Sequence, residues 1–354
     1  MIYINNKTMH LYVLWVIIHL KYQIHFNLRC AKKQRKNGGL RMKKVDLHVH
    51  STYSDGTNTP KELIKLAENE GLSAIALTDH DTLDGIPDAL DAAKNSSVEL
   101  IPGVELSTNF NNTEVHIVGL FLDHNNKQIN DYLKHQRQSR IDRNIQMCQK
   151  FCDIGINITY DKMCELYPDA VITRAHFADY LVKNKYTGDR NEAFDRYLSP
   201  GKPCFVNRHK VDPEEAVAVI HKAHGAAILA HPVLYHLGKD QMNALLEHVC
   251  SAGIDGIEAI YSTYKPADER YIRKIATEHK LLISGGSDYH GANKPNIKLG
   301  RGLGHLFVHY EVLEKLSEKA SEYEHPYKQD PYFQVADKRL AFVYNLEDVK
   351  LKIQ

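Results

Sequence analysis

Asp46-Leu47-His48-Val49-His50 ends an apolar run that begins at Lys44, which indicates a β-strand. Side chains two residues apart on a strand point to the same face, so His48 and His50 project side by side. Two adjacent imidazoles suit one metal ion, although a lone His-x-His pair also occurs by chance. Further His and acidic residues follow, nearly all after short apolar segments: Asp55, His80, Glu105, His116, His231, Asp288 and His290. This repetition predicts a metal-dependent enzyme.

The composition is that of a soluble globular protein, with 43% hydrophobic and 25% charged residues among 354. That length fits one large domain or two ordinary ones. A formal net charge of +1 gives no global attraction to nucleic acid or to a membrane. The six cysteines show no Cys-x-x-Cys and no framework spacing. They indicate reduced thiols, and we expect a cytoplasmic location.

Residues 1–41 do not match the rest of the chain. The apolar run over residues 9–20 is shorter than the ~20 residues that a membrane span needs. Its charged neighbours follow it, whereas a signal peptide carries its charge first. We therefore expect no membrane association, with a membrane-anchored form as the weaker alternative. The first strand begins directly after Met42, so Met42 is the predicted native start and residues 1–41 are predicted to be an extraneous or disordered extension.

From Lys44 onward, strand-like segments alternate with helix-like ones. The predicted strands are short, rich in Val, Ile, Leu and Ala, and bounded by turn residues, as is typical of buried parallel strands. They cover residues 44–49, 73–78, 98–102, 115–122, 226–230, 256–260 and 281–285. Repeated βα units predict a parallel sheet with right-handed crossovers. The fold class is α/β, a distorted TIM-like barrel of seven strands, with the polar residues at the rim where barrel enzymes gather catalytic groups.

The predicted barrel comprises residues 42–122 and 206–310. Residues 123–205 are helical and charged, and because they follow the fourth strand we expect them to emerge at the catalytic rim as a small inserted cap. Arg140 and Arg143 lie three residues apart there, which favours a charged helix face; a substrate-facing role is the alternative. Residues 311–354 are expected to form a helix over 311–322 and an irregular tail.

Five motifs in order resemble the PHP family, the polymerase and histidinol phosphatase phosphoesterases. They are DLHVHSTYSDG (46–56), LTDHDT (77–82), PGVELS (102–107), LAHP (229–232) and GSDYHG (286–291). The resemblance covers residues 43 to about 305 and implies a seven-stranded (β/α)7 barrel with two or three metal ions. The metal ligands that it implies are His48, His50, Asp55, His80, Glu105, His116, His231, Asp288 and His290. A His and carboxylate set without thiolates suits Mn²⁺, Fe²⁺ or Zn²⁺, and Asp46, Asp79 and Asp81 are interpreted as partners that orient imidazoles.

The segment TRAHFA (173–178) is similar to a subgroup that acts on nucleoside phosphates or trims RNA from its 5′ end. Arg174 is predicted to bind phosphate, and His176 to hydrogen-bond it or act as a general acid. We therefore expect a phosphoesterase that hydrolyses phosphomonoesters of nucleotide-like substrates, such as AMP or 3′,5′-nucleoside bisphosphates, with metal-activated water. The alternatives are a 5′-3′ exoribonuclease on short RNA, a histidinol phosphatase and a non-catalytic metal-binding module. No obligate protein partner is expected.

Overall fold

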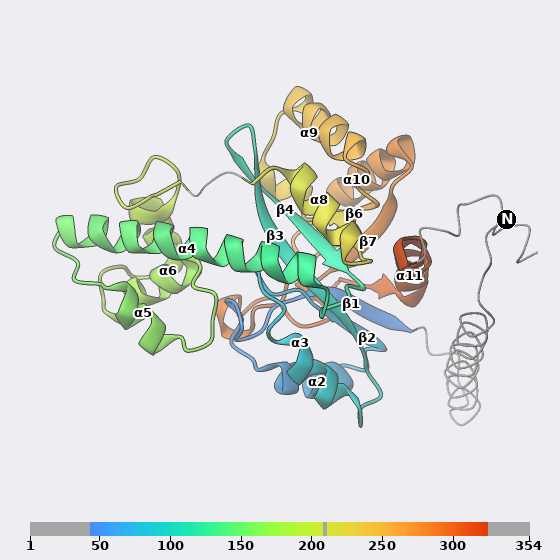
Figure 1. Cartoon of the computed structure of the whole chain (residues 1–354), viewed down its shortest axis with the longest axis horizontal. Coiled ribbons are helices and arrows are strands. Elements are labelled where there is room, and N and C mark those ends of the chain that lie inside the picture. Colours follow the sequence, from blue (N-terminus) through green and yellow to red (C-terminus); the bar gives the residue numbers. More distant parts are fainter. Residues whose placement is uncertain (1–42, 208–210, 325–354) are drawn as a thin grey trace, which may run out of the picture. The chain divides into compact units, whose positions relative to one another are not determined.

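Eight strands form one sheet in the computed structural model, which describes residues 43–207 and 211–324. Seven of them follow one another around a barrel in chain order (Figure 1): β1 (Lys44–Val49), β2 (Ala74–Leu77), β3 (Glu99–Phe110), β4 (Thr113–Leu120), β5 (Ala226–Leu229), β6 (Gly256–Tyr261) and β7 (Leu282–Gly286). This confirms the predicted α/β fold with a distorted barrel. The predictions for residues 1–41 and for the tail beyond residue 324 lie outside the described residues.

The barrel closes between the ends of β7 and β1. The main-chain N–H of His50 donates to the carbonyl of Tyr289 at 3.0 Å, and that of Asp288 donates to the carbonyl of His48 at 2.9 Å. Gly286 allows this approach, because a Cβ added there would lie 2.4 Å from the Cβ of His48. At the other end of β1, Lys44 and its neighbour pair instead with an antiparallel eighth strand, β8 (Val308–His309). β1 thus has a different neighbour at each end, which is one distortion of the barrel.

The fourth strand differs from the expectation of a wholly parallel sheet. β3 continues to Phe110 and turns through Asn111 and Asn112 into β4, which pairs antiparallel with both β3 and β5. Both asparagines have positive φ (46° and 67°), the conformation of a two-residue hairpin turn with matched strand twist. The prediction of a strand ending at residue 102 was therefore wrong, since it overlooked the Asn-Asn turn.

The reversal of β4 also changes the route of the chain into the following helices. β4 ends at the side of the barrel where β5 begins, and Asp123 N–H there donates to the carbonyl of Ala223 at 2.9 Å. The chain returns along α4 (Lys127–Asp153), whose 27 residues span about 40 Å. Figure 1 shows α4 running beside the barrel and onward into the other helices of this segment. The segment reaches the opposite rim because α4 is long, and not because it follows the fourth strand.

Helices cover the outside of the barrel and bury its apolar residues. They are α2 (Pro60–Asn69), α3 (Ile86–Ala93), α8 (Pro213–Lys222), α9 (Lys239–Ser251), α10 (Pro266–His279) and α11 (Tyr310–Glu324). α2 begins with a capping box between Thr59 and Glu62 and a proline at its first position. Short 3₁₀ turns, η2 (Pro232–Tyr235) and η3 (Gly291–Asn293), follow β5 and β7. None of the helices within residues 43–207 and 211–324 is long and apolar enough to cross a membrane.

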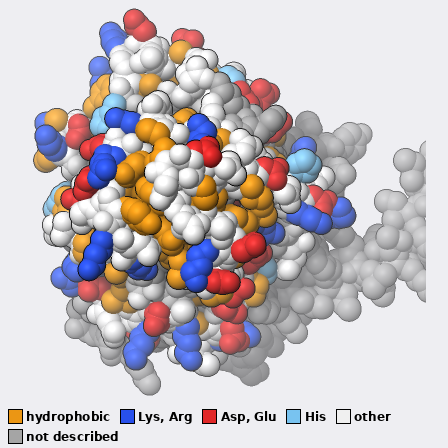
Figure 2. Space-filling view, turned by 90° about the vertical axis from the view of Figure 1, so that its left-hand side faces the viewer, with side chains coloured by type: hydrophobic (Ala, Val, Ile, Leu, Met, Phe, Trp, Pro, Cys, Tyr) orange, Lys and Arg blue, Asp and Glu red, His pale blue; other side chains and the backbone are white. Residues whose placement is uncertain are grey.

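Residues 127–205 have a hydrophobic cluster of their own. After α4 come α5 (Tyr160–Leu166), α6 (Arg174–Lys183), α7 (Arg190–Ala193) and a π-helical turn, η1 (Phe194–Leu198). Phe151 and Phe177 are fully buried at the centre of the cluster, with ring centroids 5.9 Å apart. Figure 2 shows this end of the molecule, where hydrophobic side chains gather within a surround of charged ones. The separate cluster agrees with an inserted cap, although the domain boundaries remain a prediction.

Candidate metal centre

All nine residues predicted as metal ligands lie together at one mouth of the barrel. Their ligand atoms form four groups within which every atom lies within 4.8 Å of the others. The groups are His50, Asp55, His80 and His290; His48, Glu105 and His231; His48, His50 and Asp288; and His80, Glu105 and His116. His116 reaches this mouth from the start of β4, because that strand runs opposite to its neighbours. Their role as ligands is a proposal that this convergence supports.

Glu105 lies at the centre of the cluster, with an exposed fraction of 1%. Its two carboxylate oxygens face different imidazoles. Oε2 is 3.2–3.3 Å from nitrogens of three of them, His48, His50 and His80. Oε1 is 2.8 Å from Nδ1 of His116 and 2.9 Å from Nε2 of His231. Because its two oxygens face different sets of imidazoles, the Glu105 carboxylate could contact one cation with each oxygen.

Asp55 and Asp288 each turn one oxygen toward the imidazoles. Oδ1 of Asp55 is 3.1 Å from Nε2 of His290. Oδ1 of Asp288 is 3.3 Å from Nδ1 of His290 and 3.3 Å from Nε2 of His50. The remaining oxygen of Asp288 accepts hydrogen bonds from the Tyr261 hydroxyl and the Lys294 ammonium, both at 2.5 Å. Each aspartate therefore offers one oxygen to the cluster.

Several ligand atoms are buried without a hydrogen-bond partner among the described residues. They are Nε2 of His48, Nε2 of His50, Nδ1 of His80 and Oδ1 of Asp55. Buried polar atoms in proteins are nearly always hydrogen-bonded, so a set of orphaned lone pairs facing one another indicates another kind of partner. Imidazole nitrogens and carboxylate oxygens suit divalent transition metals. The residues present therefore fit a cluster of divalent cations.

The carboxylates and imidazoles of the cluster shift one another's pKa values. Burial would raise the pKa of Glu105, but the neighbouring imidazoles outweigh burial and hold this pKa well below its usual value. Burial would likewise lower the pKa of His116 and His50, yet adjacent carboxylates raise these values to about 10 and about 9. Burial dominates at His80, whose pKa falls to about 3. Glu105 is thus held ionised among imidazoles of very different basicity.

A carboxylate from the sixth strand orients the first histidine. Glu258 accepts a hydrogen bond from Nδ1 of His48 at 3.2 Å and from the main-chain N–H of His231 at 2.8 Å. A carboxylate on the far nitrogen fixes the tautomer of an imidazole and makes its other nitrogen a stronger ligand.

The three aspartates interpreted as imidazole partners make other contacts. Asp46 accepts from the main-chain N–H groups of Ser287 and Gly300 at 2.8 and 2.7 Å. Asp79 accepts from the hydroxyls of Ser51 and Ser54, both at 2.6 Å. Asp81 forms an ion pair with Arg140. They shape the loops that carry the cluster, and Asp79 is linked to an imidazole through Ser54, whose hydroxyl oxygen lies 3.4 Å from Nδ1 of His50. The interpretation that these aspartates orient imidazoles stays a prediction.

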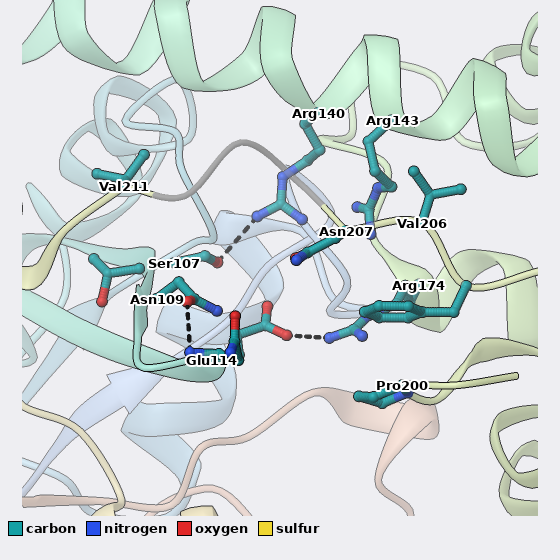
Figure 3. A pocket seen from close by; sticks show the side chains of 13 residues that line it. Ser107, Asn109, Glu114, Arg140, Arg143, Arg174, Pro200, Val206, Asn207 and Val211 are labelled. Carbon is teal, nitrogen blue, oxygen red and sulfur yellow. Dashed lines mark hydrogen bonds and ion pairs between the residues drawn. The ribbon is translucent and has the colours of Figure 1, made fainter.

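Three arginines line a pocket beside the cluster (Figure 3). Arg140 and Arg143 extend into it from α4 and are each only 6% exposed, which contradicts the prediction of a charged helix face. Arg140 also donates to the Ser107 hydroxyl at 3.1 Å. Arg174, at the start of α6, forms an ion pair with Glu114 of β4. A second pocket shares the three arginines and Glu114 with the first, and it is also lined by Asp55, His80 and His116 of the cluster.

His176 is buried, and it is not among the residues that line these two pockets. Its Nδ1 accepts the main-chain N–H of Thr173 at 2.9 Å, which caps α6, and its ring lies against Tyr167 at 4.4 Å between centroids. Burial lowers the pKa of His176 to about 4, so the ring is neutral near pH 7 with its proton on Nε2. A neutral ring can donate a hydrogen bond but is a poor general acid. The catalytic role of His176 stays a prediction.

Known proteins share these features of sequence and fold. The family model for the PHP domain matches residues 46–227. A 5′-3′ exoribonuclease of Haemophilus influenzae is 39% identical over 248 residues, which cover 70% of this chain and 90% of that protein. A 3′,5′-nucleoside bisphosphate phosphatase of Chromobacterium violaceum is 35% identical over 267 residues, covering 75% and 92%. A solved structure of an amidohydrolase from Chromobacterium violaceum, with bound sulfate and no metal, has a TM-score of 0.70 at 33% identity and covers 78% of this chain and 96% of that one. The chain therefore belongs to the PHP family.

Proposed function

We propose that this protein hydrolyses phosphomonoesters of nucleotide-like substrates, AMP or 3′,5′-nucleoside bisphosphates, using two or three divalent cations. The proposed ligands are the nine clustered residues, and the proposed ions are Mn²⁺, Fe²⁺ or Zn²⁺. The observation that carries the proposal is the position of the three arginines directly beside the cluster. A phosphate ester can then contact the cluster and the arginines at once.

The proposed cations and the arginines would each contribute to binding and hydrolysing a phosphate ester. When bound, divalent cations neutralise phosphoryl oxygens and activate water for attack. The planar guanidinium of Arg174 matches two oxygens of a phosphate. Arg140 lines the pocket, and its ion pair with Asp81 and its hydrogen bond to Ser107 hold its guanidinium in place. Arginines beside a cluster of proposed metal ligands suit a substrate with two phosphates, or with a phosphate and a polar base.

A 5′-3′ exoribonuclease on short RNA is the second candidate. It is favoured by the relative of that name, which is 39% identical over most of this chain. An RNA end presents a terminal phosphate followed by a phosphodiester, so the same pocket suits it. Histidinol phosphatase has less support, because the two relatives described above are named for RNA and for nucleoside bisphosphates. A non-catalytic module is disfavoured, because the two curated relatives described above are named as enzymes.

A phosphate-release screen with Mn²⁺ tests the proposal. AMP, a 3′,5′-nucleoside bisphosphate and a short 5′-phosphorylated oligoribonucleotide are compared, with release of mononucleotides measured for the RNA. We expect inorganic phosphate from AMP or the bisphosphate, and no activity from His48→Ala or Asp288→Ala. Arg174→Ala should raise KM while the metal content stays unchanged. Mononucleotides from RNA without phosphate from the small substrates would favour the exoribonuclease, and inertness of the metal-loaded protein toward all three would refute both.

A further inference from the structure

Thr173 connects the inserted helices to one of the proposed metal ligands. Its hydroxyl donates to Oδ2 of Asp55 at 3.0 Å, and both residues are only 6% exposed. The hydroxyl oxygen of Thr173 also accepts the main-chain N–H of Ala175 at 3.1 Å, since Thr173 is the N-cap of α6. Because Nδ1 of His176 already accepts the N–H of Thr173, the hydroxyl proton is directed to Asp55.

The contact determines which oxygen of Asp55 faces the metal cluster. With Oδ2 held by Thr173, Oδ1 points toward three imidazoles. It lies 3.1 Å from Nε2 of His290 and 3.9 Å from nitrogens of His50 and His80. This is also the oxygen that has no hydrogen-bond partner among the residues that the structure describes.

Other bonds fasten the same loop to the same helical segment. The main-chain N–H of Val171 donates to the carbonyl of Tyr53 at 3.0 Å. On the other side, the Asn293 amide donates to the carbonyl of Asp55 at 2.7 Å, while Arg190 of α7 donates to the carbonyl of Asn293 at 3.2 Å. The loop that carries Asp55 is therefore held from both sides by residues that contact or belong to the insertion.

We propose that Thr173 is a positioning residue for the metal centre, fixing Asp55 as a ligand through a single oxygen. The inference rests on the proposed ligand role of Asp55. Loss of a group that orients a metal ligand typically costs 10- to 100-fold in metal affinity. Loss of the Thr173 hydroxyl should lower the affinity for an ion bound by His50, Asp55, His80 and His290. The group of His48, Glu105 and His231 does not include Asp55, so its affinity should not change.

Three variants of the full chain isolate this hydroxyl. Thr173→Val removes it with little change in shape, and Thr173→Ser retains it. Thr159→Val is the matched control, because Thr159 caps α5 in the same segment by accepting the N–H of Lys162 at 3.2 Å. Both valine variants lose a helix cap, but Thr173→Val also removes a buried hydrogen bond, so its melting temperature should fall further than that of Thr159→Val, where the threonine is exposed.

Mn²⁺ binding is measured by calorimetry on chelator-treated protein, with metal content after dialysis as a second readout. We expect Thr173→Val to bind one Mn²⁺ 10- to 100-fold more weakly, and Thr173→Ser and Thr159→Val to match the unaltered protein. Unchanged Mn²⁺ binding in Thr173→Val, or an equal loss in Thr159→Val, would overturn the inference. Asp55→Ala separates the two proposals: if it keeps every ion, the proposed ligand set fails, and if it alone loses an ion, only the role of Thr173 fails.

Discussion

At the scale of single residues, the groups that orient the cluster come from distant parts of the chain. Glu258 bonds to His48 across 210 positions of sequence. Oδ2 of Asp288 accepts hydrogen bonds from Tyr261 and Lys294, and neither residue belongs to one of the five motifs. Strain accompanies this arrangement, since Asp288 and His231 have φ of 52° and 27°, values that favour glycine. Ligands can be recognised by their motifs, whereas the residues that hold them depend on the fold.

Replacing Glu258 tests the importance of this support. Glu258→Gln keeps the shape but removes the charge that Nδ1 of His48 faces, so the imidazole becomes a weaker ligand. We expect Mn²⁺ affinity to fall by about 10-fold or more, measured by calorimetric titration. Glu99→Gln is the control, because Glu99 accepts a hydrogen bond from the Tyr310 hydroxyl at the start of β3, outside the cluster. Equal Mn²⁺ affinity in both variants would contradict the assigned role.

The raised pKa values of two histidines make metal binding depend on pH. Before a cation binds, His116 and His50 have pKa values of about 10 and about 9, so both carry protons near pH 7. A cation must displace those protons to reach the nitrogens. Apparent Mn²⁺ affinity should therefore rise with pH from 6.5 to 8.5, by up to about tenfold per pH unit for each proton released. Titrations in buffers of different ionisation enthalpy count the protons, and pH-independent binding with no proton release would rule this out.

At the scale of elements, the strand ends were predictable and the direction of one strand was not. Short apolar runs followed by His or Asp located β1, β2, β5 and β7, and with them most of the cluster. The reversal of β4 depends on the φ values of Asn111 and Asn112, for which the Asn-Asn pair between alternating residues was an available signal. The length of α4 then compensates for that reversal. Hydrophobic periodicity in the sequence indicates where helices and strands lie. It does not indicate which charged helix residues are buried or what they contact.

Arg137 and Arg140 on α4 illustrate this limit and give a matched pair of variants. Arg140 and its partner Asp81 have side chains 7% and 1% exposed, while Arg137 and Asp84 are 31% and 56% exposed. Removing one member of a buried pair leaves a buried charge and costs about 3 kcal/mol or more. An exposed pair is worth about 0–1 kcal/mol. We expect Arg140→Ala to lower the free energy of unfolding far more than Arg137→Ala in urea titrations, and equal losses would show that the Asp81 contact contributes little.

At the scale of the whole molecule, the proposed ligands reach from His48 to His290 and include residues of six barrel strands or the loops that follow them. Cations bound there would join both ends of the barrel sheet where β7 meets β1. The barrel carries all nine proposed ligands, and the insertion carries the arginines of α4 and α6 together with Thr173.

Removing the cations should therefore destabilise the fold and not only abolish activity. A ligand that binds only the folded state stabilises it by RT ln(1 + [L]/Kd), about 2.7 kcal/mol for each site at 100-fold excess over Kd. We expect a chelator to lower the melting temperature by several degrees and added Mn²⁺ to restore it, measured by thermal unfolding. Asp288→Ala should respond more weakly to both, because it has lost a ligand that faces His50 and His290. A melting temperature that ignores chelator and Mn²⁺ alike would mean that the clustered imidazoles and carboxylates hold no cation in solution.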